Sequence, residues 1–396
     1  MNTHFCPHCM EAVEPGVRIC PHCSRNVDHQ GEEYQLPVGT VITTEAGRRY
    51  LFGAVIGAGG FGITYIAREI ASGQKVAIKE YYPFRCQPQR QSTGTVLPLE
   101  RNTSIYRSGL HSFLSEASML LAVQDIPSIV RVLDYFRANN TAYMVMEYLA
   151  GTTLKEVMDM QNRFEPVSLL SRSLPLLWDL SALHEAGVIH RDIAPDNIMQ
   201  MPDGSLKLLD FGCARSMEDG KSMTVVLKPG FAPVEQYMTR GQGPYTDVYA
   251  LCATIYYCLS GRIPPEAPSR FRAVQMGEPD PLLPLSQQGV IISPEQDSLL
   301  LWGLAMDPKA RPQTVDLLAQ ELERTLVSAD AEDLPEAAQT PEPEAAASAD
   351  EREPTSSEKP MPKPVQQSDG KLAVLLKQWW PALLLAALCI IALLFR

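Results

Sequence analysis

Residues 188–197, VIHRDIAPDN, and residues 206–212, LKLLDFG, are the stretches that decide the fold of this chain. Two further segments precede them, the glycine-rich residues 56–62, IGAGGFG, and the apolar run with a terminal lysine at residues 76–79, VAIK. Each segment alone is a weak signal, because short patterns recur by chance. Their fixed order along the chain is therefore more informative than any one of them.

The glycine-rich stretch lies between two runs of β-forming residues. Gly57, Gly59 and Gly62 have the spacing G-x-G-x-x-G, and glycines allow backbone amides to approach phosphates closely. Dinucleotide-binding folds use the same spacing between a strand and a helix. Here a β-type run, ITYIA, follows at residues 63–67, and a Ser-Gly turn separates it from VAIK. The sequence therefore predicts a hairpin, with Lys79 on the next strand beneath it.

In these four segments, over residues 48–327, the chain resembles the protein kinase family. The resemblance implies an α+β fold of two lobes, with ATP and Mg²⁺ (or Mn²⁺) between them and protein hydroxyls, including its own, as substrates. Lys79 would contact the α- and β-phosphates, Asp192 would accept the hydroxyl proton, and Asn197 with Asp210 would hold the metal. Pro195 follows the serine/threonine pattern.

The resemblance also implies a glutamate that positions Lys79, and Glu116 is the candidate. It lies at residues 113–121, where apolar residues recur on one helical face. The segment between Lys79 and Glu116 contains Pro83, Pro88, Gly94 and Pro98 and is predicted to hold an inserted loop. A solvated surface charge is the alternative for Glu116.

Residues 143–151, YMVMEYLAG, resemble the strand and hinge that bind adenine in the family. Backbone groups of Glu147 and Leu149 would bond to the base, and Met146 would stand at the back of the pocket. For Met199 and Leu209, core packing is compatible with a role in the pocket. The remaining expected nucleotide contacts are Ile56, Gly57, Gly59, Gly60, Phe61, Gly62, Thr64, Ala77, Met199 and Leu209.

One position departs from the family pattern. Ala194 stands where serine/threonine kinases place a lysine near the γ-phosphate, and a unit charge at about 4 Å is worth roughly 4 kcal/mol at an effective dielectric of 20. Ungapped alignment of residues 228–235, KPGFAPVE, places Lys228 beside the catalytic aspartate. We expect Lys228 to replace the missing cation. The alternative is a catalytically silent scaffold that recruits partners at a membrane.

Other residues are expected to build the larger lobe. Glu235 is predicted to pair with Arg311, and Asp247 to begin a helix. His190 is assigned a structural role rather than catalysis. Among the hydroxyls between residues 212 and 230, Thr224 is preferred as a phosphorylation site that would pair with Arg191.

Residues 1–28 contain the second motif, CPHC at residues 6–9 and again at residues 20–23. Cys6, Cys9, Cys20 and Cys23 match the spacing of a tetrahedral Zn²⁺ site. A thioredoxin-like redox site is the alternative, but the segment is too short for that fold and the motif is doubled. We therefore predict a zinc ribbon. Its basic and acidic residues balance, so it is expected to contact protein and not nucleic acid.

The chain of 396 residues has a formal net charge of −12. Much of this charge lies in residues 328–370, which are rich in Ala, Pro, Glu and Ser and are predicted to be a disordered linker. Residues 29–47 are assigned as a second linker. Residues 371–396 hold an uncharged apolar run behind Trp379 and Trp380, and they are predicted to span a membrane. A core helix is the alternative.

These features predict a single-pass protein of the inner cell membrane with its kinase domain and N-terminus in the cytoplasm. No signal peptide was recognised at the N-terminus. Beyond the four predicted ligands, the cysteines form an odd remainder without a disulfide pattern, as in a reducing compartment.

Overall fold

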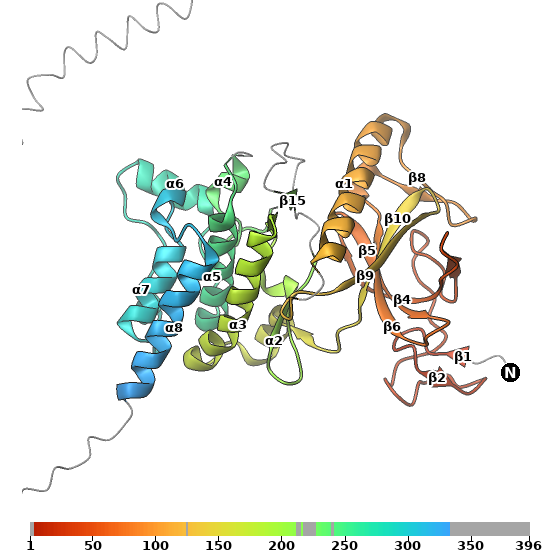
Figure 1. Ribbon diagram of the computed structural model, residues 1–396, viewed down its shortest axis with the longest axis horizontal. Helices are drawn as coiled ribbons and strands as arrows, with labels where there is room; N and C mark the ends of the chain where they lie inside the picture. The colour runs from red at the N-terminus through yellow and green to blue at the C-terminus, as the bar shows by residue number, and fades with distance from the viewer. Residues whose placement is uncertain (1–3, 124–125, 211–214, 217–226, 239–240, 333–396) are drawn as a thin grey trace, which may run out of the picture. The chain divides into compact units, whose positions relative to one another are not determined.

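The computed structural model describes residues 4–123, 126–210, 215–216, 227–238 and 241–332 (Figure 1). A sheet-rich lobe is formed by the first part of this range, and a helical lobe follows from about α2 onward. The α+β, two-lobed fold expected from the sequence is thereby confirmed.

The small lobe is built on a six-stranded antiparallel sheet with the order β3-β4-β5-β6-β10-β9. Helix α1 (Thr103–Ala122) packs on β9 and β10, because Phe113, Ala117 and Leu120 recur on one face and are buried. The strands are β3 (Val41–Thr43), β4 (Arg49–Gly59), β5 (Gly62–Glu69), β6 (Lys75–Tyr81), β9 (Val132–Ala138) and β10 (Thr141–Glu147).

The glycine-rich stretch forms the predicted hairpin. Strands β4 and β5 stay paired as far as Gly59 and Gly62, and Lys79 lies opposite Thr64 on the next strand, β6. The pairing of β4 with β5 is irregular between Phe52 and Val55, where two residues of β4 face one of β5. Such a bulge bends the strand and leaves the extra residue without a partner on β5.

The predicted insertion lies between β6 and α1. It contains η1 (Phe84–Cys86), β7 (Gln89–Arg90), β8 (Val96–Leu97) and η2 (Glu100–Asn102). Arg90 fixes it to the sheet, because its buried guanidinium donates to the buried Glu80 carboxylate at 2.6 Å. The hydroxyls of Tyr65 and Tyr143 donate to the same carboxylate, which is therefore satisfied despite its burial.

Residues 29–47 are not the plain linker that the sequence suggested. Residues 41–43 form β3, which pairs with β4, and Leu36 is buried in the core of the lobe with its N–H donating to the Tyr65 hydroxyl at 3.0 Å. The sheet therefore begins before residue 48. In front of it, β1 (His4–Phe5) and β2 (Ala12–Val13) form the small hairpin of the cysteine-rich segment.

The large lobe is mainly helical. Thr153 and Glu156 form a capping box at the start of α2, and prolines begin α3, α5 and α7, where a missing N–H is harmless. The helices are α2 (Leu154–Gln161), α3 (Pro166–Glu185), α4 (Val234–Tyr237), α5 (Pro244–Ser260), α6 (Ala267–Gln275), α7 (Pro294–Gly303) and α8 (Val315–Glu332).

Short strands and turns complete this lobe. They are β11 (Thr152–Thr153), β12 (Val188–Ile189), β13 (Ile198–Gln200), β14 (Leu206–Leu208) and β15 (Arg215–Ser216), with η3 (Pro195–Asn197), η4 (Ser286–Gln288) and η5 (Pro308–Ala310). Helix α8 continues to Glu332, past the predicted domain end at residue 327. In the described part of the chain, no helix has the length and apolarity needed to cross a membrane. The predicted anchor at residues 371–396 lies outside that part, as does the linker from residue 333.

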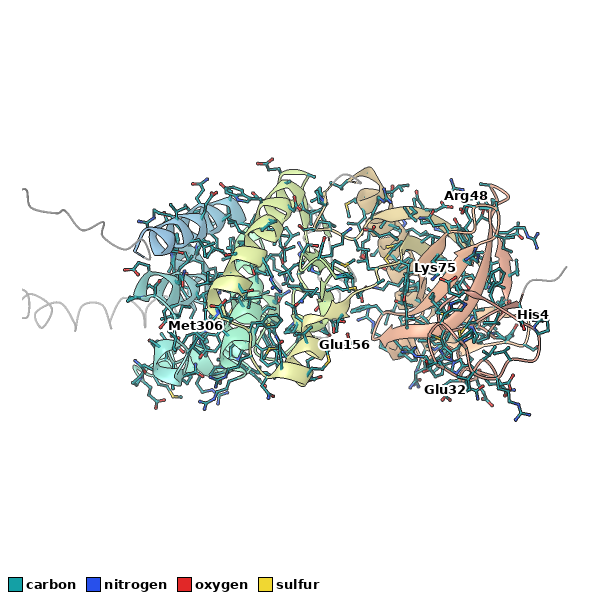
Figure 2. All side chains as sticks on the ribbon, turned by 90° about the horizontal axis from the view of Figure 1, so that it is seen from below. His4, Glu32, Arg48, Lys75, Glu156 and Met306 are labelled. Carbon is teal, nitrogen blue, oxygen red and sulfur yellow. The ribbon has the colours of Figure 1, made fainter. Side chains whose placement is uncertain are left out.

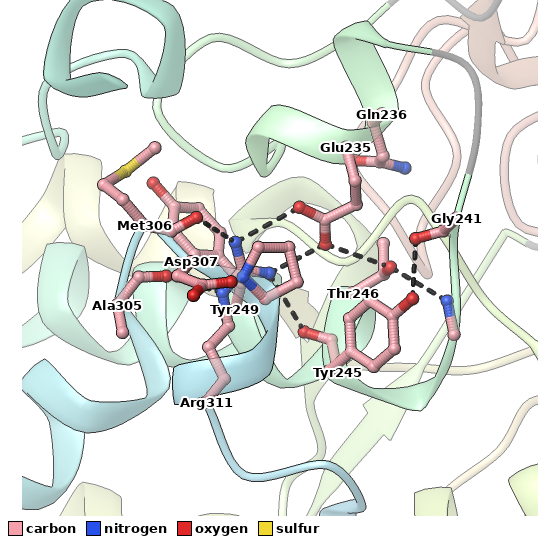
Figure 3. Close-up of polar contacts among 12 residues, drawn as sticks. Glu235, Gln236, Gly241, Tyr245, Thr246, Tyr249, Ala305, Met306, Asp307 and Arg311 are labelled. Carbon is pink, nitrogen blue, oxygen red and sulfur yellow. Dashed lines mark hydrogen bonds and ion pairs between the residues drawn. The ribbon is translucent and has the colours of Figure 1, made fainter. Parts of the chain in front are cut away.

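The predicted ion pair between Glu235 and Arg311 is confirmed (Figure 3). The guanidinium nitrogens of Arg311 lie 2.7 and 3.1 Å from the Glu235 carboxylate oxygens, and both side chains are buried. Arg311 also donates to the carbonyls of Ala305, Met306 and Tyr245. It therefore joins α4, α5 and the turn before α8 at one point.

Removal of Arg311 should destabilise the large lobe. Arg311→Ala leaves the Glu235 carboxylate buried without its cation, a change that costs about 3–5 kcal/mol of unfolding free energy. Urea unfolding of the full chain measures the loss. Lys155→Ala is the control, since Lys155 and Asp159 form an exposed pair within one helix that should add little. Equal midpoints for the two variants would contradict the assignment.

Candidate active site

The loop between β12 and η3 carries the HRD residues, and the buried carboxylate of Asp247 holds it. The backbone N–H groups of His190 and Arg191 donate to Asp247 at 2.8 and 2.7 Å, and the His184 ring lies 2.8 Å from the same carboxylate. Although burial opposes its ionisation, His184 and these donors hold the pKa of Asp247 below its usual range. Helix α5, which contains Asp247 in its first turn, therefore fixes the loop.

His190 is completely buried and connects two segments of the cleft. Its Nδ1 atom accepts from the Asp192 N–H at 3.2 Å, so its Nε2 atom donates to the carbonyl of Leu209 at 2.8 Å. Burial lowers the pKa of His190, which keeps the ring neutral. These contacts fit the structural role that was expected for it.

Asp192 and Asn197 lie against each other. The Asn197 side-chain amide donates to the Asp192 carbonyl at 2.7 Å and to its carboxylate Oδ2 at 2.9 Å. With its nitrogen used in this way, Asn197 has its Oδ1 atom left as a possible metal ligand. The other Asp192 oxygen remains for a substrate hydroxyl or a cation.

Lys228 supplies that cation. Its Nζ atom lies 3.5 Å from Asp192 Oδ1 and 2.8 Å from Asp196 Oδ1, so the activation segment brings a positive charge beside the catalytic loop. Ala194, which occupies the usual lysine position, is fully buried. Desolvation raises the pKa of Asp192 to about 6 even though Lys228 opposes this rise.

Lys79 is buried and forms an ion pair with Asp210. Asp210 lies two residues after the end of β14 and has a φ of 54°, a left-handed conformation. The chain then enters residues 211–214, which lie outside the described range. Although desolvation opposes it, Lys79 holds the pKa of Asp210 below its usual range. Glu116 is buried on α1, and its pairing with Lys79 stays a prediction. Phe211 and Gly212 of the DFG motif are also outside the described residues.

The glycine hairpin has one position where only glycine fits. A Cβ atom at Gly62 would approach the Glu80 carbonyl closer than 3.0 Å, because β5 and β6 pack tightly there. Gly57 and Thr64 are paired across the hairpin, while Gly60 and Phe61 form its tip. Ile56 is half exposed, as a residue above a cleft would be.

The predicted adenine pocket has apolar walls from strands of both lobes. Ala77 and Met146 are opposite each other on β6 and β10 and are both largely buried. Met199 on β13 is partly buried, and the hinge passes so close above it that a Cβ atom at Gly151 would collide with it. Leu209 is partly buried at the end of β14.

Only part of the hinge backbone is available to a ligand. The Glu147 N–H donates to the Arg131 carbonyl at 3.0 Å, so a nucleotide could use the Glu147 carbonyl but not its amide. The Glu147 side chain accepts from the Arg131 N–H and from Lys207. Its contact with adenine through the carbonyl, and that of Leu149, stay predictions.

The four N-terminal cysteines form a compact cluster. All four sulfur atoms lie within 4.8 Å of one another, and the pairs Cys6–Cys23 and Cys9–Cys20 are 3.7 Å apart. A tetrahedral zinc with Zn–S distances of about 2.3 Å separates its sulfurs by about 3.8 Å, whereas a disulfide would bring them to about 2 Å. The donor set and its spacing therefore fit Zn²⁺.

Two supports of the site were missed in the sequence. Gln236 donates to the Arg191 carbonyl at 2.7 Å, and the Asp247 carboxylate was expected only as a helix start. A polar residue inside an otherwise apolar helix was the available signal for Asp247. Arg90, which holds the insertion, gave no local signal because its partner Glu80 belongs to another strand.

Comparison with known proteins agrees with this geometry. The model of the protein kinase domain family matches residues 50–322. A probable serine/threonine-protein kinase of Streptomyces coelicolor, SCO3848, is 30% identical over 291 residues, which cover 71% of this chain and 40% of that protein. Serine/threonine-protein kinase PknB of Mycobacterium leprae is 31% identical over 285 residues, covering 70% and 43% respectively.

A solved structure, described as the apo form of PpkA-294, has a TM-score of 0.62 and 34% sequence identity. It aligns with 73% of this chain and 99% of its own chain. The chain belongs to the protein kinase family. It matches only about two fifths of the length of the Streptomyces and Mycobacterium relatives.

The fall of the reaction rate at low pH should depend on Lys228. A protonated Asp192 cannot accept a proton, so kcat/KM should fall as pH drops through about 6. Lys228 lowers the pKa of Asp192, and Lys228→Met should therefore move this fall to higher pH. At pH values below the pKa of Asp192, kcat/KM should fall by about tenfold for each unit by which the substitution raises that pKa. Phosphoryl transfer measured from pH 5 to 9 tests this.

Lys309→Met serves as the control, because it removes an exposed lysine from the turn η5. An unchanged fall of the rate at low pH in Lys228→Met would show that Lys228 does not act on Asp192.

Proposed function

We propose that this chain is an active serine/threonine protein kinase that transfers the γ-phosphate of ATP to protein hydroxyls, its own included. The observation that carries this proposal is the pairing of Asp192 with Asn197 and Lys228 at hydrogen-bond and ion-pair distance. Phosphoryl transfer needs positioning and charge neutralisation more than covalent chemistry. The described residues of the loop provide both.

Each predicted residue has a distinct task. Asp192 would orient the acceptor hydroxyl and take its proton, while Lys79 would bind the α- and β-phosphates. Asn197 and Asp210 offer the oxygen ligands that Mg²⁺ prefers. The bound ion would neutralise phosphate charge during transfer. Since Lys79 pairs with Asp210 in this structure, ATP and metal would have to draw the two apart.

A silent scaffold is the second candidate, and Ala194 is the observation that favours it. Lys228 weakens that argument, because its ammonium group lies near the carboxylate that the missing lysine would serve. A pseudokinase would have no need for a cation between Asp192 and Asp196. We therefore place the active enzyme first.

The remaining parts of the proposal concern location and zinc. The apolar run at residues 381–395, with two tryptophans before it and Arg396 behind it, supports a single span of the inner membrane with the kinase domain in the cytoplasm. Four clustered thiolates would hold a structural Zn²⁺, which stabilises segments too small for a core of their own.

The activity is tested with the full chain in detergent, incubated with labelled ATP and Mg²⁺ and a general protein acceptor. Asp192→Ala should lower label transfer about 100-fold or more, because general-base groups contribute at least that much. Asp203→Ala, which removes an exposed aspartate bonded to Ser205 in a turn, should label as the wild type does. Acid hydrolysis of the product should release phosphoserine or phosphothreonine.

Equal labelling of wild type and Asp192→Ala would remove the kinase assignment, and so would absence of labelling in both. Phosphotyrosine as the sole product would contradict the serine/threonine assignment.

A further inference from the structure

We propose that the zinc ribbon braces the kinase domain of its own chain. Its first knuckle, residues 5–11, docks on the strands that carry the glycine-rich hairpin, and residues 20–23 form the second knuckle. Zinc would hold the first knuckle in its docking shape and thereby support nucleotide binding from outside the cleft. The inference rests on the proposed zinc site, but not on the proposed catalytic activity.

A main-chain hydrogen bond joins the two parts. The Ala54 N–H of β4 donates to the Pro7 carbonyl at 2.8 Å, and Pro7 lies between two cysteines of the first knuckle. This bond forms at the bulge of β4, where Ala54 has no partner in β5. Towards the N-terminus, Phe52 donates to Thr40 on the same edge of the strand. The knuckle thus continues the edge pairing of β4 beyond β3.

Met10 seals the contact. It is 1% exposed although it lies in a segment of few apolar residues, and its backbone has a φ of 56°. A Cβ atom on Gly53 would lie closer than 3.0 Å to both the Met10 side chain and the Pro7 carbonyl. The absence of a side chain at position 53 is therefore what lets the knuckle reach the sheet.

Charged groups on the neighbouring strands complete the docking. Arg68 on β5 donates to the Met10 carbonyl at 3.2 Å, and its guanidinium lies 4.8 Å from the centre of the Phe5 ring. Lys75 on β6, labelled in Figure 2, forms an ion pair with Glu11. The first knuckle therefore contacts three successive strands of the small lobe.

Zinc would connect this docked knuckle to the second one. Pro21 and His22 of the second knuckle are exposed, whereas Cys6 and Pro7 of the first are buried. The short sulfur pairs, Cys6–Cys23 and Cys9–Cys20, each join one knuckle to the other. The metal would thus fix the shape of the first knuckle, whose contacts carry the docking. The second knuckle would contribute by supplying Cys20 and Cys23 as ligands.

The strands that the ribbon contacts end in the glycine-rich hairpin of the predicted nucleotide site. Strand β4 runs from Gly53 and Ala54 to Gly57 and Gly59, and β5 returns from Gly62 to Arg68. Release of the knuckle would free the base of this hairpin and increase the motion of its tip. Nucleotide affinity should then fall although the docking contacts lie at Gly53, Ala54, Arg68 and Lys75, which are not among the predicted ATP contacts.

Two variants of the full chain separate metal binding from docking. Cys20→Ser/Cys23→Ser removes ligands of the second knuckle and leaves residues 5–11 unchanged. Gly53→Ala leaves all four cysteines and the predicted ATP contacts in place but obstructs docking. The readouts are zinc content by elemental analysis, hydrogen exchange of backbone amides, and the Kd of a fluorescent ATP analogue.

We expect the cysteine variant to lose its zinc, and Gly53→Ala to keep it. In both, the Ala54 amide should exchange about tenfold faster or more, because its bond to Pro7 is lost. The analogue should bind about fivefold more weakly or worse, as for a coupling of ordinary size. Hydrogen exchange in helix α5 should stay at the wild-type rate, which would show that the large lobe of each variant is folded. Glu14→Gln, an exposed change within the ribbon, is the control.

Unchanged Ala54 exchange after loss of zinc would overturn the brace, and so would wild-type exchange or affinity in Gly53→Ala. Retention of zinc by the cysteine variant would instead reject the proposed ligands, and the brace with them. None of these readouts requires phosphoryl transfer, so a failure of the catalytic proposal would be seen separately.

Discussion

The carboxylate of Asp247 is the constraint on which the catalytic loop depends. It is buried beneath the loop, and its two oxygens collect backbone N–H groups from His190 and Arg191. Arg191 has a φ of 67°, so the loop adopts a backbone shape that an L residue rarely takes unaided. The bonds to Asp247 compensate this cost and turn Asp192 towards Asn197. The position of the proposed base is thus set from α5, outside the loop.

Charge in the cleft is balanced by two lysines from different lobes. Lys79 of the sheet pairs with Asp210, and Lys228 of the activation segment pairs with Asp192 and Asp196. Three carboxylates would repel one another if these cations were absent. Burial is the main cause of the raised pKa of Asp192, Lys228 opposes the rise, and the charge of Asp210 adds to it. Because Lys228 belongs to the activation segment, its position links the state of that segment to the charge of Asp192.

The sequence predicted the parts whose signals are local. The hairpin, the helix around Glu116 and the inserted loop could be predicted because spacing and motif order specify them. The Glu235–Arg311 pair joins distant segments and could be predicted only from the resemblance to the protein kinase family. Pairing between distant segments could not be predicted in the same way. The strand at residues 41–43 needs β4 as a partner, and the ribbon's contact with Gly53 depends on a bulge that no single segment encodes.

The inserted segment after β6 has a further consequence for how this small lobe can vary. Its Arg90 neutralises Glu80, the residue that follows Lys79 on the same strand, in a site closed to water. Deleting the insertion while keeping Glu80 would strand a negative charge inside the sheet, one residue from the lysine that is proposed to grip phosphate. The insertion and Glu80 therefore depend on each other. A relative without the insertion, or a chimera made in the laboratory, must also replace Glu80.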